Sequence, residues 1–251
     1  METACGKPLE VCLQGLQRLE YRGYDSAGVA LTAPGMDHVE VRKKAGRLAN
    51  LIEDVERKPM PMATVGIGHT RWATNGVPND INAHPHTSQD GKVAIIHNGI
   101  IENYTELKEK LLKHGYTFYS QTDTEVVIKL VDYYYKKYNL GPIDAIAKTM
   151  VRVRGSYALE LMFRDYPGEI WVARKDSPMI IGIADGETYV ASDVPAILKY
   201  TRNVYYIGNL EFAKLTPGEA HFYDLNGDEI EKQTTEIKWD AEAAEKAGFE
   251  H

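Results

Sequence analysis

The sequence predicts an α+β fold of layered sheets and helices, and three observations support this prediction. The expected strands and helices come in blocks rather than in strict alternation, which favours an α+β arrangement over a doubly wound sheet. Of the 251 residues, 43% are hydrophobic and 26% are charged, as in globular proteins that bury a real core. The longest apolar runs, such as residues 179–183, are far too short to span a bilayer, so we expect no membrane partner.

In the N-terminal half, an amphipathic helix is expected first. Pro8 starts this helix, Leu and Cys side chains follow at near-helical spacing as far as Leu19, and Gly23 ends it. A long polar loop rich in Asn, Pro and His comes later, and loops of this length tend to be functional. The expected order is strands 27–32 and 39–41, helix 45–56, strand 64–70, loop 72–91, strand 92–97 and helix 103–114.

In the C-terminal half, two helices are expected before a series of strands. The tail from Trp239 onwards is charged and rich in Ala, so it is predicted to be a helix or a linker. The expected order is helices 123–138 and 140–153, strands 157–163, 170–174, 179–183 and 187–191, helix 195–200, and strands 204–207, 212–215, 220–223 and 234–238.

The net charge and the cysteine content argue against a nucleic-acid-binding protein and against a disulfide-rich one. The formal net charge is −7 and no cluster of Lys and Arg offsets it, which argues against a nucleic-acid partner. Cys5 and Cys12 are the two cysteines, which argues against a disulfide scaffold and fits a reducing compartment. The N-terminus lacks the apolar segment of a secretory signal, so we expect a cytoplasmic protein.

The segment HTRWATNG, residues 69–76, leaves a predicted buried strand and enters the long loop. Arg71 could form paired hydrogen bonds with a carboxylate, and Trp72 beside it could form an apolar wall or lid. The alternative is a surface Arg next to a packed Trp.

The segment NAHPH in the same loop contains His84 and His86. A metal site would need further ligands at matched spacing, and none is apparent nearby. We therefore expect histidines with structural or supporting roles, and neither a metal nor a cofactor.

Two further segments combine polar groups with a strand end or a helix start. Asn98 carries an amide donor beside the backbone of Gly99, a pair that could hold a developing oxyanion; the alternative is an ordinary Asn-Gly turn. Thr122 or Asp123 could cap the helix that follows, and Asp123 could instead receive a substrate ammonium group. Arg22, in the charged and aromatic segment RLEYRGYDSAG, is open to two interpretations, an Arg–Asp corner or part of a site wall.

The order and spacing of these motifs are more informative than any one of them. RLEYRGYDSAG, GIGHTRWATNG, NAHPH, HNGIIENY, TDTE, RGSYAL and ASDVPA occur in one series. This series resembles the class II glutamine amidotransferase domain of the glucosamine-6-phosphate synthase family, from Val11 to His251. The resemblance implies the four-layer αββα sandwich of the N-terminal-nucleophile hydrolases over residues 1–238. It also implies a linker over 239–251, leading toward an absent sugar isomerase region that acts on fructose 6-phosphate.

The resemblance implies that L-glutamine is the substrate, and that ammonia released from it serves hexosamine synthesis. A zwitterion needs a cation at one end and an anion at the other, with amide donors at the reacting carbonyl. The implied roles are Arg71 for the α-carboxylate, Asp123 for the α-ammonium, Asn98 and Gly99 for the oxyanion hole, Trp72 and Thr74 for the closing loop, Arg22 for support and His86 for a flanking position. The EYRGYDSAG and HTRWATNG segments favour the hexosamine branch over other class II amidotransferases, such as those feeding phosphoribosylamine or asparagine synthesis.

The family's nucleophile is an N-terminal Cys that opens a central strand, and its thiolate attacks the glutamine amide. Here the chain starts METACGKP; Cys5 superficially matches that Cys, but Lys7 and Pro8 cannot begin a buried strand. We therefore expect the first strand to be missing and the true start to lie roughly eight to ten residues upstream. Cys12 is expected in the core, which leaves Cys5 as the candidate nucleophile.

The alternative function is a catalytically inactive fragment that binds glutamine but lacks the nucleophile. Loss of a central strand would also expose a sheet edge, and such an edge invites association, so a homodimer is one expected assembly.

Overall fold

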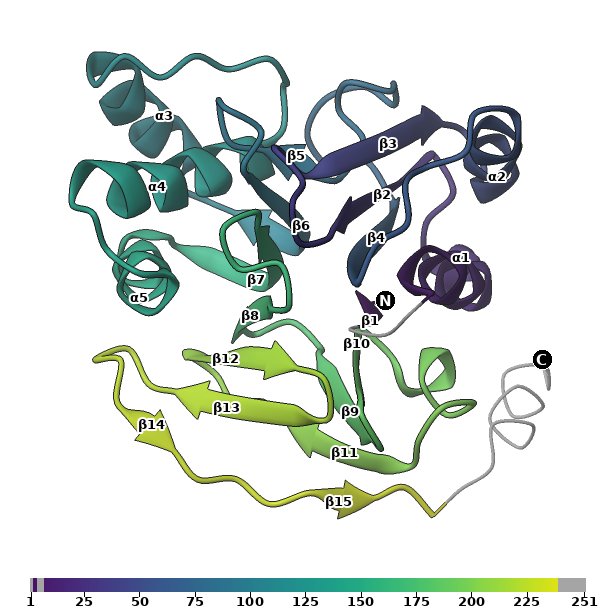
Figure 1. Cartoon of the computed structure of the whole chain (residues 1–251). Coiled ribbons are helices and arrows are strands. Elements are labelled where there is room, and N and C mark those ends of the chain that lie inside the picture. The colour runs from purple at the N-terminus through teal and green to yellow at the C-terminus, as the bar shows by residue number, and fades with distance from the viewer. Residues whose placement is uncertain (1, 4–6, 239–251) are drawn as a thin grey trace, which may run out of the picture.

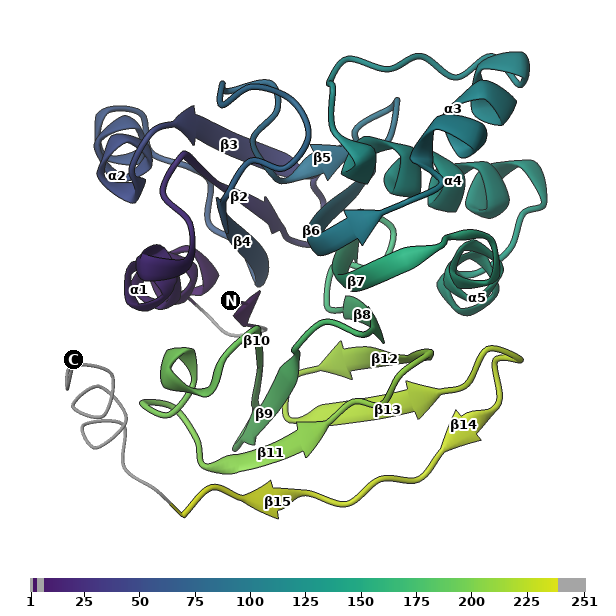
Figure 2. The ribbon, with the colours of Figure 1, turned by 180° about the vertical axis from the view of Figure 1, so that it is seen from behind.

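Two β-sheets pack face to face at the centre of the structure, and helices cover the outer face of each (Figure 1). The computed structural model describes residues 2–3 and 7–238. The same arrangement from behind shows the strand-rich C-terminal part below the helices (Figure 2). The expected α+β fold is confirmed.

The first sheet has eight strands in the order β15-β11-β9-β10-β1-β4-β2-β3, and neighbouring strands are antiparallel. Its strands are β1 Glu2–Thr3, β2 Ser26–Thr32, β3 Glu40–Ala45, β4 Val65–Arg71, β9 Ile180–Ala184, β10 Glu187–Ala191, β11 Asn203–Tyr206 and β15 Thr235–Glu236.

The second sheet has seven strands in the order β14-β13-β12-β8-β7-β6-β5, again with antiparallel neighbours. Its strands are β5 His86–Thr87, β6 Val93–Ile101, β7 Gly155–Phe163, β8 Ile170–Lys175, β12 Glu211–Thr216, β13 Glu219–Tyr223 and β14 Glu229–Ile230.

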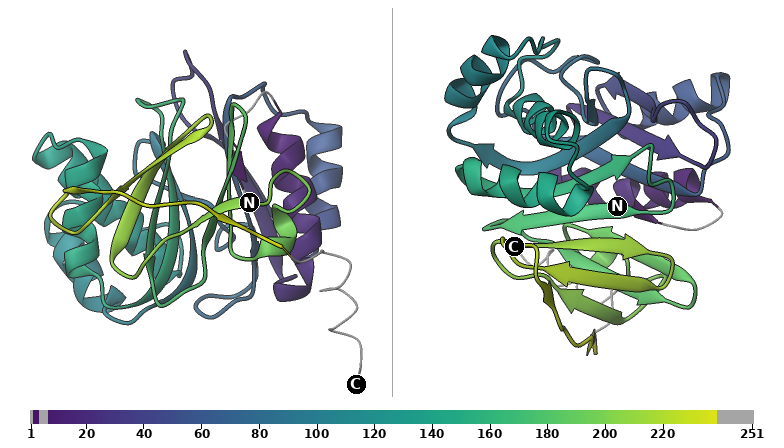
Figure 3. Two further views of the ribbon diagram at one scale, coloured as in Figure 1. Left: turned by 90° about the horizontal axis from the view of Figure 1, so that it is seen from below. Right: turned by 60° about the vertical axis from the view of Figure 1, so that its left-hand side comes forward.

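Helices form the two outer layers. The helices are α1 Pro8–Leu19, α2 Leu48–Arg57, α3 Tyr104–Lys113, α4 Asp123–Lys137 and α5 Pro142–Arg152. The first two pack on the first sheet, where Leu16 and Leu51 meet Val29. The other three pack on the second sheet, where Val127 and Met150 meet Leu159. Seen from below, the four layers run helix, sheet, sheet, helix (Figure 3), which confirms the expected αββα sandwich.

Helix α1 packs closely against strand β4. Pro8 is its first residue, where a missing backbone N–H costs nothing, and Cys12 and Leu16 lie on its buried face. A Cβ on Gly68 of β4 would lie 3.1 Å from the Leu16 Cδ1 atom, so the glycine permits this close approach. Leu16 and Leu19, near the C-terminal end of α1, also line a cavity beside β4.

Strand β6 alternates between two apolar layers. Val93 and Ile95 pack toward the helices, whereas Ala94 and Ile96 pack into the core between the sheets. Successive residues of a strand face opposite sides, so Asn98 continues the series that faces the first sheet. This alternation places the Asn98 amide between the two sheets.

The expectation that no strand precedes the first helix needs correction. Glu2–Thr3 forms a two-residue strand, β1, in the centre of the first sheet, where Glu2 pairs with Val190 and Thr3 with Gly66. Because β1 joins β10 and β4, the structure does not expose the central edge that suggested association. Cys5, and the predicted linker 239–251, lie outside the described residues.

Two local predictions also change. The helix expected over 195–200 is a 3₁₀ turn at Val194–Ala196, and the long polar loop contains the short strand β5. Of the helices in the described ranges, none is long and apolar enough to cross a bilayer.

Candidate functional site

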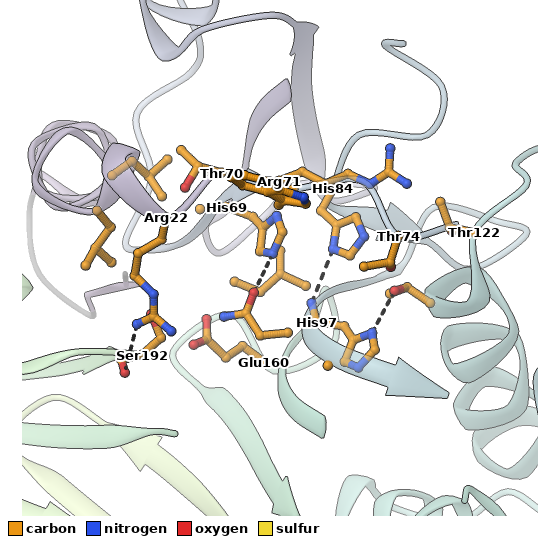
Figure 4. Close-up of a pocket in the computed structure, with 18 of the residues that line it drawn as sticks. Arg22, His69, Thr70, Arg71, Thr74, His84, His97, Thr122, Glu160 and Ser192 are labelled. Atoms are coloured by element: carbon orange, nitrogen blue, oxygen red, sulfur yellow. Dashed lines mark hydrogen bonds between the residues drawn. The ribbon is translucent and has the colours of Figure 1, made fainter. Parts of the chain in front are cut away.

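A cavity of about 240 Å³ opens where the ends of β4 and β6 meet the start of helix α4 (Figure 4). Residues from both sheets and from both helical layers contribute to its wall. The lining residues are Leu16, Leu19, Arg22, Gly68, His69, Thr70, Arg71, Trp72, Thr74, His84, Ile96, His97, Asn98, Gly99, Thr122, Asp123, Thr124, Glu160 and Ser192.

Arg71 is the last residue of β4 and is only 4% exposed. Its Nη2 atom donates hydrogen bonds to the backbone carbonyls of Asn75 and Gly76, whereas Nη1 has no partner within the part of the chain that is described. Burial lowers the pKa of Arg71, and the carboxylates of Asp25 and Asp123 oppose that shift. A guanidinium always carries its charge in proteins, so this buried cation has one nitrogen, Nη1, whose hydrogen-bonding capacity is unused.

Asp123 is the first residue of α4 and is also only 4% exposed. Thr122 caps the helix, because its hydroxyl accepts from the backbone N–H of Glu125 at 3.4 Å. The Asp123 carboxylate is therefore not used as the cap; its Oδ2 atom accepts from the backbone N–H of Ile101 at 2.8 Å. The cavity thus contains an anion as well as the Arg71 cation.

Asn98 is oriented by a histidine. The His69 Nε2 atom lies 2.8 Å from Asn98 Oδ1. An amide oxygen only accepts, so His69 must carry its proton on Nε2, and the Asn98 Nδ2 group remains free to donate. Burial lowers the pKa of His69 to about 4, so the ring is neutral near pH 7.

Gly99 is required by its surroundings. Its φ is +126°, and a Cβ there would lie 2.2 Å from the backbone oxygen of Ser156. Only glycine fits both conditions, so its backbone can approach the cavity beside Asn98.

Other histidines complete a neutral wall. The His84 ring stacks on His69 with centroids 4.3 Å apart, and its Nδ1 atom accepts from the His97 backbone N–H at 3.3 Å. His97 Nδ1 lies 2.8 Å from the Thr124 hydroxyl. Burial lowers the pKa of both His84 and His97. Among residues 2–3 and 7–238, no group of three His, Cys, Asp or Glu side chains is arranged to hold a metal ion.

His86 does not line the cavity, although we expected it to flank the site. It is fully buried, and its ring nitrogens lie 2.9 Å from the Thr122 hydroxyl and 3.0 Å from the Tyr119 hydroxyl. His84, two residues earlier, occupies the flanking position. His86 instead supports the cap of helix α4 from behind.

Arg22, Trp72 and Thr74 all line the cavity, as expected. Arg22 donates from Nη1 to the Ser192 hydroxyl at 3.2 Å, on the far side of the cavity from Thr74 (Figure 4). Trp72 is 63% exposed and meets Tyr24 edge to face, with centroids 5.5 Å apart. An exposed aromatic ring at the rim of a cavity suits a covering role.

Residues 69–199, more than half of the chain, match a family model described as a glutamine amidotransferase domain. The chain belongs to the glutamine amidotransferase family.

Curated relatives of this amidotransferase chain are much longer than the chain itself. It is 51% identical over 241 residues to a glutamine–fructose-6-phosphate aminotransferase (isomerizing) of Caldanaerobacter subterraneus, with 96% of this chain and 39% of that protein covered. Proteins of the same name from Thermus thermophilus and Pyrococcus horikoshii are 47% and 46% identical, with 96% and 98% of this chain covered, and 39% and 40% of theirs. The chain therefore spans about two fifths of the length of these relatives.

Solved structures agree on the fold. A glutamine phosphoribosylpyrophosphate amidotransferase from B. subtilis superimposes with a TM-score of 0.74 at 23% identity, with 90% of this chain and 49% of that chain covered. A class-II glutamine aminotransferase domain protein from Silicibacter pomeroyi gives 0.57 at 13% identity, with 80% and 91% covered. The chain thus has the fold of the N-terminal-nucleophile amidotransferases.

Several residues that line the cavity were not predicted as site residues from the sequence. His69 lies inside a recognised motif but was given no role, and His84 was expected only in a structural or supporting role. Glu160 could have been predicted as a functional residue, because it is the one acidic residue in the apolar strand β7. Cys12 is fully buried on α1 and does not line the cavity.

Proposed function

We propose that this chain binds free L-glutamine and is the glutamine-hydrolysing domain of a glutamine–fructose-6-phosphate aminotransferase that serves hexosamine synthesis. One observation carries the proposal. A buried Arg71 with a free Nη1, the carboxylate of Asp123 and the oriented amide of Asn98 line the same cavity.

Each end of glutamine has a matching group. The Arg71 guanidinium takes the α-carboxylate, and the Asp123 carboxylate takes the α-ammonium. The side-chain carbonyl then faces Asn98 Nδ2 and the backbone N–H of Gly99, which stabilise the oxyanion that forms during attack. One such donor contributes about 3 kcal/mol to transition-state stabilisation.

Other cavity residues position the substrate. Thr74 and the exposed Trp72 lie on the segment after β4 and cover bound glutamine. Arg22 supports the opposite wall through Ser192. The hexosamine acceptor, fructose 6-phosphate, is proposed from the names of the relatives, and it would react in an isomerase region that receives the ammonia.

The reaction is the hydrolysis of a side-chain amide. The thiol gives its proton to a base and attacks the amide carbon as a thiolate, and the –NH₂ group takes up that proton and leaves as ammonia. Water then cleaves the thioester to glutamate and regenerates the thiol, so glutamine and water give glutamate and ammonia. Cys12 is too buried to serve, which leaves the thiol of Cys5 as the candidate on this chain.

Calorimetric titration with L-glutamine, beside an ammonia-release assay, tests the proposal. We expect binding and release in the wild type, and loss of release with retained binding in Cys5→Ser. Binding without release in the wild type would favour the inactive glutamine-binding alternative. Absence of binding would overturn the proposal.

Analogues separate the two charged contacts. Glutaramic acid lacks the α-amino group, and 4-aminobutyramide lacks the α-carboxylate. Both should bind at least tenfold more weakly than L-glutamine, since each loses one charged hydrogen-bonding partner, worth roughly 1.5–3 kcal/mol.

A further inference from the structure

We propose that Glu160 makes the cavity select the neutral carboxamide of glutamine over the γ-carboxylate of glutamate. The inference rests on the proposed function, because it concerns the same ligand in the same cavity. It adds a specificity-determining residue to the wall described above.

The strand register places Glu160 close to the expected amide position. On the paired strands β6 and β7, Ile96 lies opposite Glu160 and Asn98 lies opposite Ala158. Directly opposite residues share a face of the sheet, as do residues two apart along a strand. Glu160 is therefore the diagonal neighbour of Asn98 on the face between the sheets, with about 7–8 Å between the two residues across the strand pair.

The carboxyl group of Glu160 has an unmet hydrogen-bonding need. Its residue is 7% exposed, and its Oε2 atom has no partner in the described structure. Glu160 lines the cavity (Figure 4), and its partner on the neighbouring strand, Ile96, belongs to the apolar core between the sheets. A buried polar group without a partner is rare in folded proteins, so one that lines a ligand cavity points to a ligand that supplies the missing donor.

The carboxamide of glutamine supplies such a donor. With its oxygen held by Asn98 and Gly99, the –NH₂ group on the same carbon turns away from them and offers two N–H donors. The Glu160 side chain reaches toward this –NH₂ group, and its carboxylate accepts one of the two N–H donors. Glutamate carries an oxygen there instead, so two carboxyl groups would meet, and one of them must hold a proton.

Glu160 is a group of the cavity wall whose protonation changes near neutral pH. Burial raises the pKa of Glu160 to about 7, and the positive charge of the chain's N-terminal amino group opposes that rise. On the described elements that line the cavity, Arg22 and Arg71 keep their charge, and burial lowers the pKa of His69, His84 and His97. Asp123, which is held at the start of α4, is a further charged group of this wall.

The test is calorimetric measurement of Kd for L-glutamine and L-glutamate at pH 6, 7 and 8. In the wild type, we expect the ratio of the glutamate Kd to the glutamine Kd to rise about tenfold from pH 6 to pH 8, as Glu160 loses its proton. The isosteric variant Glu160→Gln should bind glutamate at least tenfold more tightly than the wild type at pH 8, with a ratio that no longer changes with pH.

Glu109→Gln is the matched control, because Glu109 is exposed on α3 and lies outside the cavity. It should keep the wild-type ratio at every pH. If glutamine binds but the ratio is flat with pH and Glu160→Gln leaves it unchanged, the inference is wrong while the proposed function stands. If glutamine does not bind the wild type at all, the proposed function fails and this inference with it.

Discussion

The cavity wall has a charged part, with Arg71 and Asp123, and a neutral part, with buried histidines and Asn98. Arg71 and Asp123 are almost fully buried and carry opposite charges; Arg71 Nη1 is unpaired, and Asp123 Oδ2 accepts from the Ile101 backbone N–H. His69 and His97 are just as buried but neutral, and they orient neighbouring groups through directed hydrogen bonds. The difference matches two tasks: fixed ligand charges are met by opposite charges, whereas charge that develops only during reaction is met by oriented dipoles.

The neutral part of the wall should matter most for turnover. Replacing Asn98 by Ala removes the oriented Nδ2 donor, so kcat for ammonia release should fall by about 10²–10³-fold. The Kd for glutamine should change only a few-fold, because the donor acts mainly in the transition state. Steady-state kinetics beside calorimetry would show this split, and an unchanged kcat would remove Asn98 from the oxyanion hole.

The charged part of the wall should matter most for binding. Arg71→Lys keeps the positive charge but loses the planar fork, so glutamine affinity should fall by roughly 10–100-fold. Arg57→Lys, on the exposed side of α2, is the matched control and should bind as the wild type does. Equal affinities for all three proteins would show that the Nη1 edge of Arg71 does not meet the ligand.

Acid stability separates Glu160 from the histidines. His69 has a folded pKa of about 4, below its unfolded value of 6.5, so the unfolded state takes up the proton first and stability is lost as pH falls through this window. Glu160 has a folded pKa of about 7, above its unfolded value of 4.5, so its contribution to stability is present at low pH and is lost as pH rises.

The variant Glu160→Gln removes the second contribution. Its stability should rise more steeply than that of the wild type between pH 4.5 and pH 7, and should exceed it by about 3 kcal/mol at pH 8. Urea unfolding at each pH measures both curves. Parallel curves would mean that Glu160 does not hold a proton in the folded state near neutral pH.

The rim should matter least. Trp72→Ala removes an exposed ring that packs on Tyr24, so we expect the KM for glutamine to rise two- to five-fold, about 0.4–1 kcal/mol, with little change in the unfolding midpoint. A large loss of stability would instead assign Trp72 a structural role.

Much of the cavity could be predicted from the sequence, because its residues stand in recognisable motifs. Arg22, Arg71, Asn98 and Asp123 were expected in one site and line one cavity. Helix α1 followed from the spacing of its apolar residues after Pro8. Such patterns are local, so a single sequence carries them.

The remainder depended on contacts that no local pattern encodes. Strand β1 has only two residues, too few for any periodicity, and its pairing partners are distant in the sequence. His84 and His86 share one short segment, and only the path of the loop decides which ring faces the cavity. Glu160 could have been noticed, since an acid in a buried apolar strand needs a reason.

A crystal structure of the chain with bound L-glutamine tests the central claim most directly. We expect the α-carboxylate within hydrogen-bonding distance of Arg71 Nη1, the α-ammonium at Asp123 and the side-chain oxygen at Asn98 Nδ2. Glutamine bound in the reverse orientation, or outside this cavity, would contradict the claim.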